Sequence, residues 1–258
     1  MEIWRLLISP PDCGARNLAT DQAIAEQVSY GASLPTLRFY SWNRPTLSLG
    51  YAQPISLVDS RLASRLKIPI VRRSTGGQAI LHDDELTYSI ALPRIHALTK
   101  KGIMASYQIF NNAFARGFKQ LGLPVTQGPW APASHAYQDA VCFGAPSTHE
   151  LAAGDHKMLG SAQTRVGGTM LQHGSLPLSH NSTLDELLGQ PQPLSRRGLR
   201  DFLTPTPTIG TLIQVFTAAL AKELNISTHP GHLSSHEKET RNALMHKRYE
   251  CDSWLYRC

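Results

Sequence analysis

The sequence predicts an α+β domain in which mixed β-sheets are flanked by helices. Several short runs with strand-like alternation lie close together in the first part of the chain. Longer segments further along have apolar residues at helical spacing. Strands and helices do not alternate regularly, which argues against a repeated β-α-β architecture.

The expected strands are short, and turn residues or prolines bound most of them. The first ends at Pro10-Pro11, and the second and third flank a turn at residues 43–45. The strands are expected at Met1 to Ser9, Thr36 to Ser41, Thr46 to Gly50, Pro69 to Arg73, Ala79 to Leu81 and Leu86 to Leu92.

The expected helices are amphipathic. Ser106 is a plausible N-cap of the clearest one, and Gly122 is placed to end it. Asp21, within the first helix, is expected on a solvated face. The helices are expected at Asn17 to Ser29, Leu57 to Leu66, Ser106 to Leu121, Leu184 to Leu188 and Ile209 to Leu224.

A chain of 258 residues is long enough for one large domain with a small appendage. We expect a main domain over residues 1–225 and a polar, partly flexible C-terminal extension over 226–258. The first residues lack the basic start and long apolar run of a signal peptide. No stretch of 18 apolar residues predicts a membrane span, so a cytoplasmic location is expected.

The net charge of +6 is compatible with binding either nucleic acid or an acidic protein. Lysine and arginine are scattered, and no DNA- or RNA-binding signature is present. The four cysteines form no C-x-x-C pair, which disfavours a zinc or redox motif. Several histidines, including His149 and His173, lie in the central part of the chain, but their spacing fits no standard zinc site, so no metal is expected.

Two adjacent glycines, Gly76 and Gly77, separate two expected strands, and Arg72 and Arg73 precede them. Such a pair permits positive φ and close approach of a ligand to backbone amides. The spacing matches neither a Walker loop nor a dinucleotide-binding fingerprint. From these residues alone, a ligand-binding turn and an ordinary hairpin turn remain equally good readings.

Cys142 precedes the segment Phe143-Gly144-Ala145-Pro146, which is expected to turn sharply and present the thiol. A nucleophilic cysteine works as the thiolate, and a nearby cation favours that form. Lys157, at the start of a strand-like run, is a candidate for this cation. The alternatives are a buried structural cysteine and a surface lysine at a strand edge.

The continuation of the glycine turn extends the motif over residues 72–89 as R-R-x-T-G-G-x-A-x-x-H-D-x-E-L-x-Y-S. This motif resembles the signature of the biotin/lipoate protein ligase superfamily, and the pattern Asn17-x-Ala19-x-Asp21-x-Ala23 is similar to that of its first helix. The resemblance implies a catalytic domain related to class II aminoacyl-tRNA synthetases and biotin synthetases. It implies a slot for a lipoyl or octanoyl chain, with the substrate-binding residues Arg72, Gly76, Gly77, His82, Gly160 and Ala162.

Further matches favour one branch of this superfamily. The runs A-x-C-F-x-x-P-S-x-x-E-L from residue 140, K-x-x-G-S-A-Q-x-R from residue 157 and L-Q-H-G-S from residue 171 resemble the LipM-type octanoyltransferases. Lipoate ligases share the lysine block but lack a nucleophilic cysteine at the position of Cys142. The sequence departs from the branch at His149, where an aromatic or similarly large residue is usual.

The resemblance implies that Cys142 carries the acyl group and that Lys157 stabilises the thiolate or orients the thioester. The implied donor is octanoyl-acyl-carrier protein, and the implied acceptor is a lysine of a lipoyl domain or of the glycine cleavage H protein. No cofactor is implied, because amide formation from a thioester is downhill. Backbone amides at Gly76-Gly77 or Gly160 are candidates for the oxyanion hole, and His82 for the general base.

Acidic carrier proteins also account for the basic charge, so neither nucleic acid nor membrane is an expected partner. Three other functions remain open from the sequence. They are an ATP-dependent lipoate-protein ligase, an amidotransferase that moves lipoyl or octanoyl groups between carrier proteins, and a non-enzymatic regulator that binds such proteins.

Overall fold

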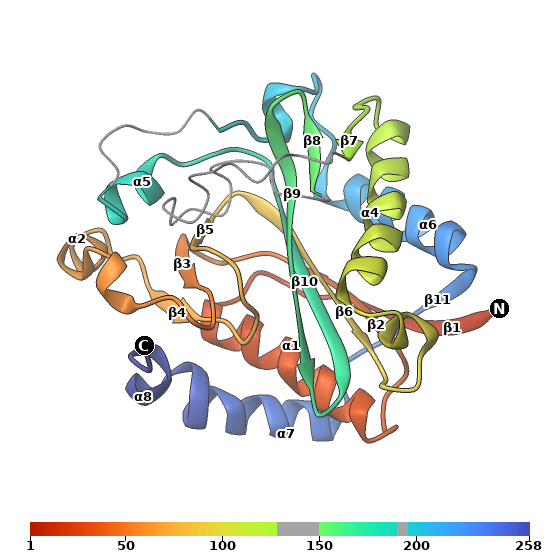
Figure 1. Cartoon of the computed structure of the whole chain (residues 1–258), viewed down its shortest axis with the longest axis horizontal. Helices are drawn as coiled ribbons and strands as arrows, with labels where there is room; N and C mark the ends of the chain where they lie inside the picture. Colours follow the sequence, from red (N-terminus) through yellow and green to blue (C-terminus); the bar gives the residue numbers. More distant parts are fainter. Residues whose placement is uncertain (128–149, 190–195) are drawn as a thin grey trace.

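Two mixed β-sheets organise the chain, in agreement with the predicted α+β class (Figure 1). The structure is a computed structural model and describes residues 1–127, 150–189 and 196–258. The large sheet has the strand order β11-β1-β2-β6-β10-β9-β8-β7, and the small sheet has the order β4-β3-β5.

The large sheet changes from parallel to antiparallel pairing at the boundary between β2 and β6. β1 runs parallel to both β11 and β2, whereas every later neighbour is antiparallel. Its strands are β1 (Glu2–Ile8), β2 (Thr36–Tyr40), β6 (Glu85–Leu92), β7 (Thr126–Gln127), β8 (Leu151–Ala153), β9 (His156–Val166), β10 (Thr169–Pro177) and β11 (Ile226–Pro230). Those of the small sheet are β3 (Thr46–Leu49), β4 (Ile70–Arg72) and β5 (Ile80–His82).

Two long helices, α4 (Ile103–Gln120) and α6 (Ile209–Leu224), cover one face of the large sheet. Phe114 and Phe118 of α4 meet Phe216 of α6 at ring-centroid distances of 5.3 and 5.2 Å. The same apolar cluster includes the sheet residues Leu37 and Ile90. Because aromatic side chains bury large areas, this face forms the main hydrophobic core.

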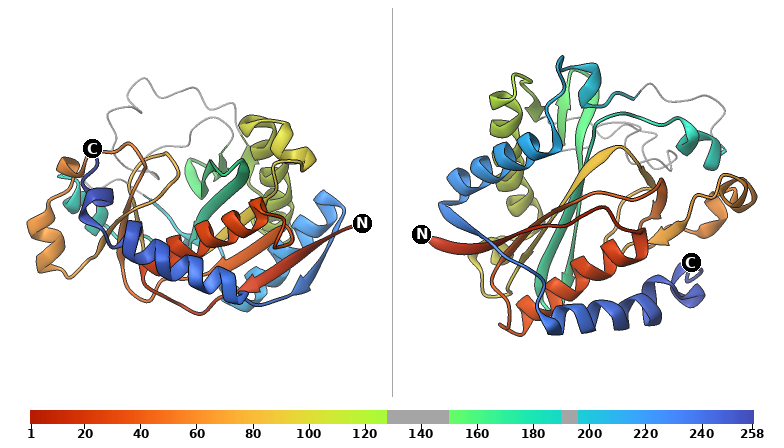
Figure 2. Two further views of the ribbon diagram at one scale, coloured as in Figure 1. Left: turned by 90° about the horizontal axis from the view of Figure 1, so that it is seen from below. Right: turned by 180° about the vertical axis from the view of Figure 1, so that it is seen from behind.

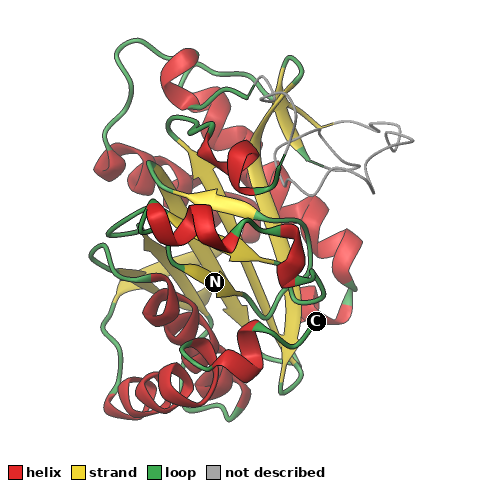
Figure 3. Cartoon of the chain, turned by 90° about the vertical axis from the view of Figure 1, so that its left-hand side faces the viewer, coloured by secondary structure: helices red, strands yellow, loops and turns green. Residues whose placement is uncertain are grey.

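The opposite face carries α1 (Gly14–Ser29), and α7 (Ser235–Leu244) runs alongside it (Figure 2). Figure 3 shows the strands between these two groups of helices. The remaining helices are η1 (Ile55–Leu57), α2 (Ser60–Arg65), α3 (Ala97–Lys100), α5 (Thr183–Leu187), η2 (Leu199–Asp201), the π-helical turn η3 (Met245–Tyr249) and α8 (Asp252–Leu255). Within the described ranges, no helix has the length and apolar character needed to cross a membrane.

Side-chain alternation gives the two faces of the large sheet different chemistry. On β2, Leu37 and Phe39 point into the main core, whereas Arg38 and Tyr40 contact α1. Polar and charged side chains are therefore buried beneath α1, on the face opposite the aromatic core.

The structure corrects two details of the predicted helices. Ser106 is not an N-cap, because α4 begins at Ile103 and the Ser106 hydroxyl donates to the carbonyl oxygen of Gly102 within the helix. The segment Leu57 to Leu66 is divided between η1 and α2, since the Asp59 side chain caps α2. The expected boundary at residue 225 stays a prediction; residues 226–258 form β11, which pairs with β1, and the helices α7 and α8.

Candidate active site

A partly open cavity lies between the glycine turn, the small sheet and the β9–β10 hairpin. It is lined by Leu18, Tyr40, Trp42, Arg73, Gly77, Ile80, His82, Thr87, Gly160, Ser161, Ala162, His173, Gly174 and Ser175. Four of the predicted substrate-binding residues, Gly77, His82, Gly160 and Ala162, therefore line one cavity.

The glycine turn is shaped by Arg73. Its guanidinium donates to the carbonyl oxygens of Gly76 at 2.8 Å, Gln78 at 2.8 Å and Ser48 at 3.0 Å. Gly77 has a φ of +91°, a conformation that favours glycine. The backbone of Gly50 packs so closely on the Gly77 carbonyl that a Cβ at residue 50 would overlap it. These contacts explain why glycines are needed at this wall.

Arg72 and Gly76 do not line this cavity, although both were predicted to bind substrate. The Arg72 guanidinium donates to the carbonyl oxygens of Gly50 at 2.9 Å, Gln53 at 2.5 Å and Leu255 at 2.7 Å. Successive residues of an extended strand face opposite sides, so only one of the two adjacent arginines can reach the turn. Gly76 lies at a separate surface groove, beside Ser74 and Trp254.

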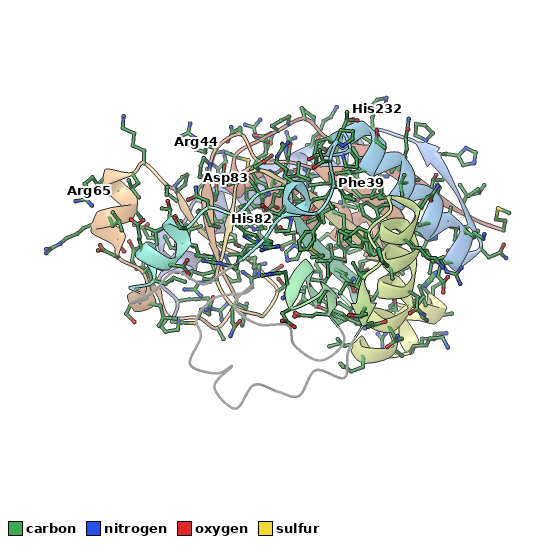
Figure 4. The ribbon with its side chains drawn as sticks, turned by 90° about the horizontal axis from the view of Figure 1, so that it is seen from above. Phe39, Arg44, Arg65, His82, Asp83 and His232 are labelled. Atoms are coloured by element: carbon green, nitrogen blue, oxygen red, sulfur yellow. The ribbon has the colours of Figure 1, made fainter. Side chains whose placement is uncertain are left out.

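His82 lies in the interior of the molecule, whereas Arg65 extends from α2 at its edge (Figure 4). The His82 ring stacks on Trp42 with centroids 3.9 Å apart, and its Nδ1 lies 2.9 Å from Oε1 of Glu85. Burial opposes the ionisation of Glu85, but His82 and the hydroxyls of Thr87 and Ser175 outweigh it, so the pKa of Glu85 is lowered. A charged carboxylate therefore orients the imidazole at the cavity wall.

Asp21 is fully buried, so its predicted place on a solvated face is wrong. Its carboxylate pairs with Arg38 at 2.7 Å and accepts hydrogen bonds from Tyr40 at 2.8 Å and Ser89 at 2.7 Å. Burial raises the pKa of Asp21, but Arg38 and the hydrogen bonds outweigh this and lower it. The helical period placed Asp21 on α1 but could not show that this side of the helix covers polar strands.

His173 connects this buried network to the glycine turn. Its Nε2 lies 2.7 Å from Oγ1 of Thr75, and its Nδ1 lies 3.7 Å from Oδ2 of Asp21. Burial lowers the pKa of His173, with Asp21 acting in the opposite direction. The L-Q-H-G-S run marked this histidine in the sequence, but its contact with Thr75, 98 residues away, required the fold.

Lys157 is buried near the start of β9, not exposed at a strand edge. Its ammonium forms an ion pair with Glu150, which comes directly before β8. Gly160 of the cavity wall lies three residues further along the same strand, a distance of about 10 Å. Lys157 is not among the residues that line the cavity. Cys142 and His149 lie outside the described residues.

In the described part of the chain, no three His, Cys, Asp or Glu side chains gather as they would around a metal ion. The described site combines a mostly apolar cavity, glycines in its lining and two histidine–carboxylate pairs, and a buried Lys157–Glu150 ion pair lies on the same strand as Gly160. This combination is typical of an α+β catalytic domain with a small-molecule pocket.

Comparisons with known proteins agree with this class. The model of the lipoyl protein ligase A/B catalytic domain matches residues 13–221. The octanoyltransferase LipM of Geobacillus kaustophilus is 36% identical over 275 residues, covering 99% of both chains. That of Moorella thermoacetica is 36% identical over 270 residues, covering 99% of this chain and 98% of its own.

Solved structures share the fold. A lipoate-protein ligase A bound with ATP superposes with a TM-score of 0.84 at 24% identity, covering 99% of each chain. A bipartite lipoate protein ligase from Thermoplasma acidophilum, solved as part of an archaeal lipoylation system, has a TM-score of 0.77 at 20% identity. The alignment covers 99% of this chain and 97% of that one. The chain belongs to the lipoyl protein ligase A/B catalytic domain family, and within it to the group of octanoyltransferase relatives that match it from end to end.

Proposed function

We propose that this protein transfers an octanoyl group from octanoyl-acyl-carrier protein to the lysine of a lipoyl domain, through a thioester on Cys142. The observation that carries the proposal is the similarity to octanoyltransferases over 99% of the chain. Similarity of fold to lipoate ligases does not separate transfer from ATP-dependent ligation, because both reactions are found on this fold.

In the proposed first step, the Cys142 thiolate attacks the thioester carbonyl of the donor. A new C–S bond forms, the old C–S bond breaks, and the carrier leaves as a thiolate that takes up the proton which Cys142 lost on ionising. The octanoyl chain lies in the cavity between Gly77 and the β9–β10 wall. Lys157, paired with Glu150, supplies the positive charge that stabilises the thiolate and the developing oxyanion.

In the second step, the ε-amine of the acceptor lysine attacks the acyl-enzyme. The C–N bond forms as the Cys142 sulfur leaves, and the amine proton passes to a base. His82 is our candidate for this base, since it lines the cavity and Glu85 contacts its Nδ1. The preferred acceptor is either a dehydrogenase lipoyl domain or the glycine cleavage H protein.

Intact-mass spectrometry tests the covalent step. Wild-type protein incubated with octanoyl-acyl-carrier protein is expected to gain about 126 Da, and Cys142→Ala to gain nothing. Lys157→Ala is expected to acylate about 100-fold more slowly, because it removes a charge aimed at the transition state. Lys119→Ala, at an exposed position on α4, serves as the charge-matched control.

Equal labelling of wild type and Cys142→Ala would overturn the proposed acyl-enzyme. A parallel reaction with free octanoate and ATP separates transfer from ligation. Amide formation that requires ATP would reject the transferase proposal. Donors in which another lipoylated or octanoylated protein replaces the acyl-carrier protein test the amidotransferase alternative in the same assay.

A further inference from the structure

The segment around α8 lies against the loop that supports the glycine turn. One guanidinium, that of Arg72, holds both parts together. It donates to Gly50 and Gln53 in the loop at 2.9 and 2.5 Å, and to the carbonyl oxygen of Leu255 at 3.0 and 2.7 Å. In return, the indole N–H of Trp254 donates to the Arg72 carbonyl at 2.8 Å. Arg72 thus donates to a residue 183 positions away and accepts from one 182 positions away.

Aromatic and cationic side chains extend this contact. The Arg257 guanidinium lies 3.8 Å from the ring centroid of Tyr51, 4.8 Å from that of Trp254, and donates to the Tyr51 hydroxyl at 2.7 Å. Arg248 lies on Trp254 at 4.2 Å. Cations over tryptophan and tyrosine faces attract the ring quadrupole. We call Trp254, Leu255 and Arg257 the α8 clamp.

The loop held by the α8 clamp is bonded directly to the glycine turn. The backbone N–H of Tyr51 donates to the Thr75 carbonyl at 2.8 Å, and that of Arg73 donates to the Leu49 carbonyl at 3.0 Å. Gly50 packs against the carbonyl of Gly77, which lines the cavity. A displacement of the loop would therefore move the cavity wall.

We propose that the α8 clamp positions the glycine turn over the acyl cavity, with Trp254 and Arg257 as positioning residues. Residues 74–78 of the turn include no large apolar side chain, and its shape depends on hydrogen bonds to carbonyl oxygens. Such a segment opens locally unless neighbouring structure holds it. The catalytic meaning of the clamp rests on the proposed acyl transfer, whereas its mechanical role does not.

Hydrogen exchange measures the mechanical role directly. In Trp254→Ala, amides in residues 48–53 and 73–79 are expected to exchange about tenfold faster than in wild type, while those of β10 stay unchanged. Tyr256→Ala is the matched control, since this neighbouring aromatic residue is 57% exposed. Trp254→Phe retains an aromatic ring but loses the N–H donor. In this variant the exchange rate of the same amides is expected to rise only about threefold.

Steady-state kinetics measures the catalytic consequence. A loosened turn weakens contacts to the acyl chain in ground and transition states alike, so Trp254→Ala is expected to raise KM for the octanoyl donor about fivefold, with kcat within about twofold of wild type. Unchanged exchange at both segments in folded Trp254→Ala, or an equal increase throughout β10, would overturn the clamp. Faster exchange at the turn with no octanoyl transfer by wild type would retain the clamp and reject the proposed function.

Discussion

Asp21 shows how a single charged residue supports the site from beneath. Its carboxylate accepts hydrogen bonds from Arg38, Tyr40 and Ser89, which lie on the neighbouring strands β2 and β6. Arg38 also donates to Asn17 on α1. A buried ion pair is costly unless its remaining hydrogen-bonding capacity is met. Here these donors satisfy the hydrogen-bonding capacity of the Asp21 carboxylate, and they join α1 to the strands that bear the cavity residues.

We expect Asp21→Asn to destabilise the protein by about 3–5 kcal/mol, because it leaves the Arg38 charge buried without its counter-ion. Urea unfolding monitored by circular dichroism measures the change. Asp155→Asn, in the exposed turn between β8 and β9, provides the same chemical substitution without a buried partner. Matching unfolding midpoints for the two variants would contradict this account.

At the scale of elements, the cavity depends on how closely the glycine turn approaches the end of β3. Arg73 shapes the turn, and Gly50 lets the two backbones meet. Both features depend on a contact between segments that are neighbours in space because β4 and β5 pair on either side of β3. A side chain at residue 50 would separate them.

We therefore expect Gly50→Ala to destabilise the protein by about 1–3 kcal/mol and to raise KM for the acyl donor, since the added Cβ overlaps the Gly77 carbonyl. Gly210→Ala, near the start of α6, is the control because its Cβ would meet its nearest neighbour at 3.8 Å. Thermal unfolding and donor titration report the two effects. A Gly50→Ala variant with wild-type stability and KM would exclude close backbone packing as the reason for this glycine.

At the scale of the whole molecule, the two faces of the large sheet have different roles. The α4–α6 face is aromatic and supplies most of the buried apolar area, whereas the α1 face buries ionisable groups. Two of its acids, Asp21 and Glu85, have lowered pKa values, and burial also lowers the pKa of His173. Near the end of β10, burial and Arg196 lower the pKa of His180 to about 4.

These shifts predict acid lability. A histidine whose folded pKa lies below its unfolded value stabilises the fold fully above about pH 6.5, and this contribution is lost as the pH falls through about 4. We expect the free energy of unfolding to decrease by up to about 3 kcal/mol over this interval through His180. Urea unfolding at pH 7, 6 and 5 measures it, and His180→Gln should show a shallower decline. The same pH dependence in both proteins would disprove the role of His180.

The local patterns of the sequence were sufficient for much of the architecture. The spacing in Ile209–Leu224 predicted α6 with the bounds that the structure has, and Gly122, with a φ of +85°, follows the end of α4 as expected. The motif over residues 72–89 predicted a glycine turn, and Gly77 and His82 of this motif line the cavity, whereas their binding of an acyl chain stays a prediction. Cys142, which the sequence alone marks as the nucleophile, stays a prediction.

The tertiary structure decided which of these residues meet. It assigned Arg73 rather than Arg72 to the turn, buried Asp21 and Lys157, and joined His173 to Thr75. Periodicity reports which side of its own element a residue occupies, but not which distant element covers that side. Which element covers that side follows from the order and direction of the strands, and these bring the separate motifs together around one cavity.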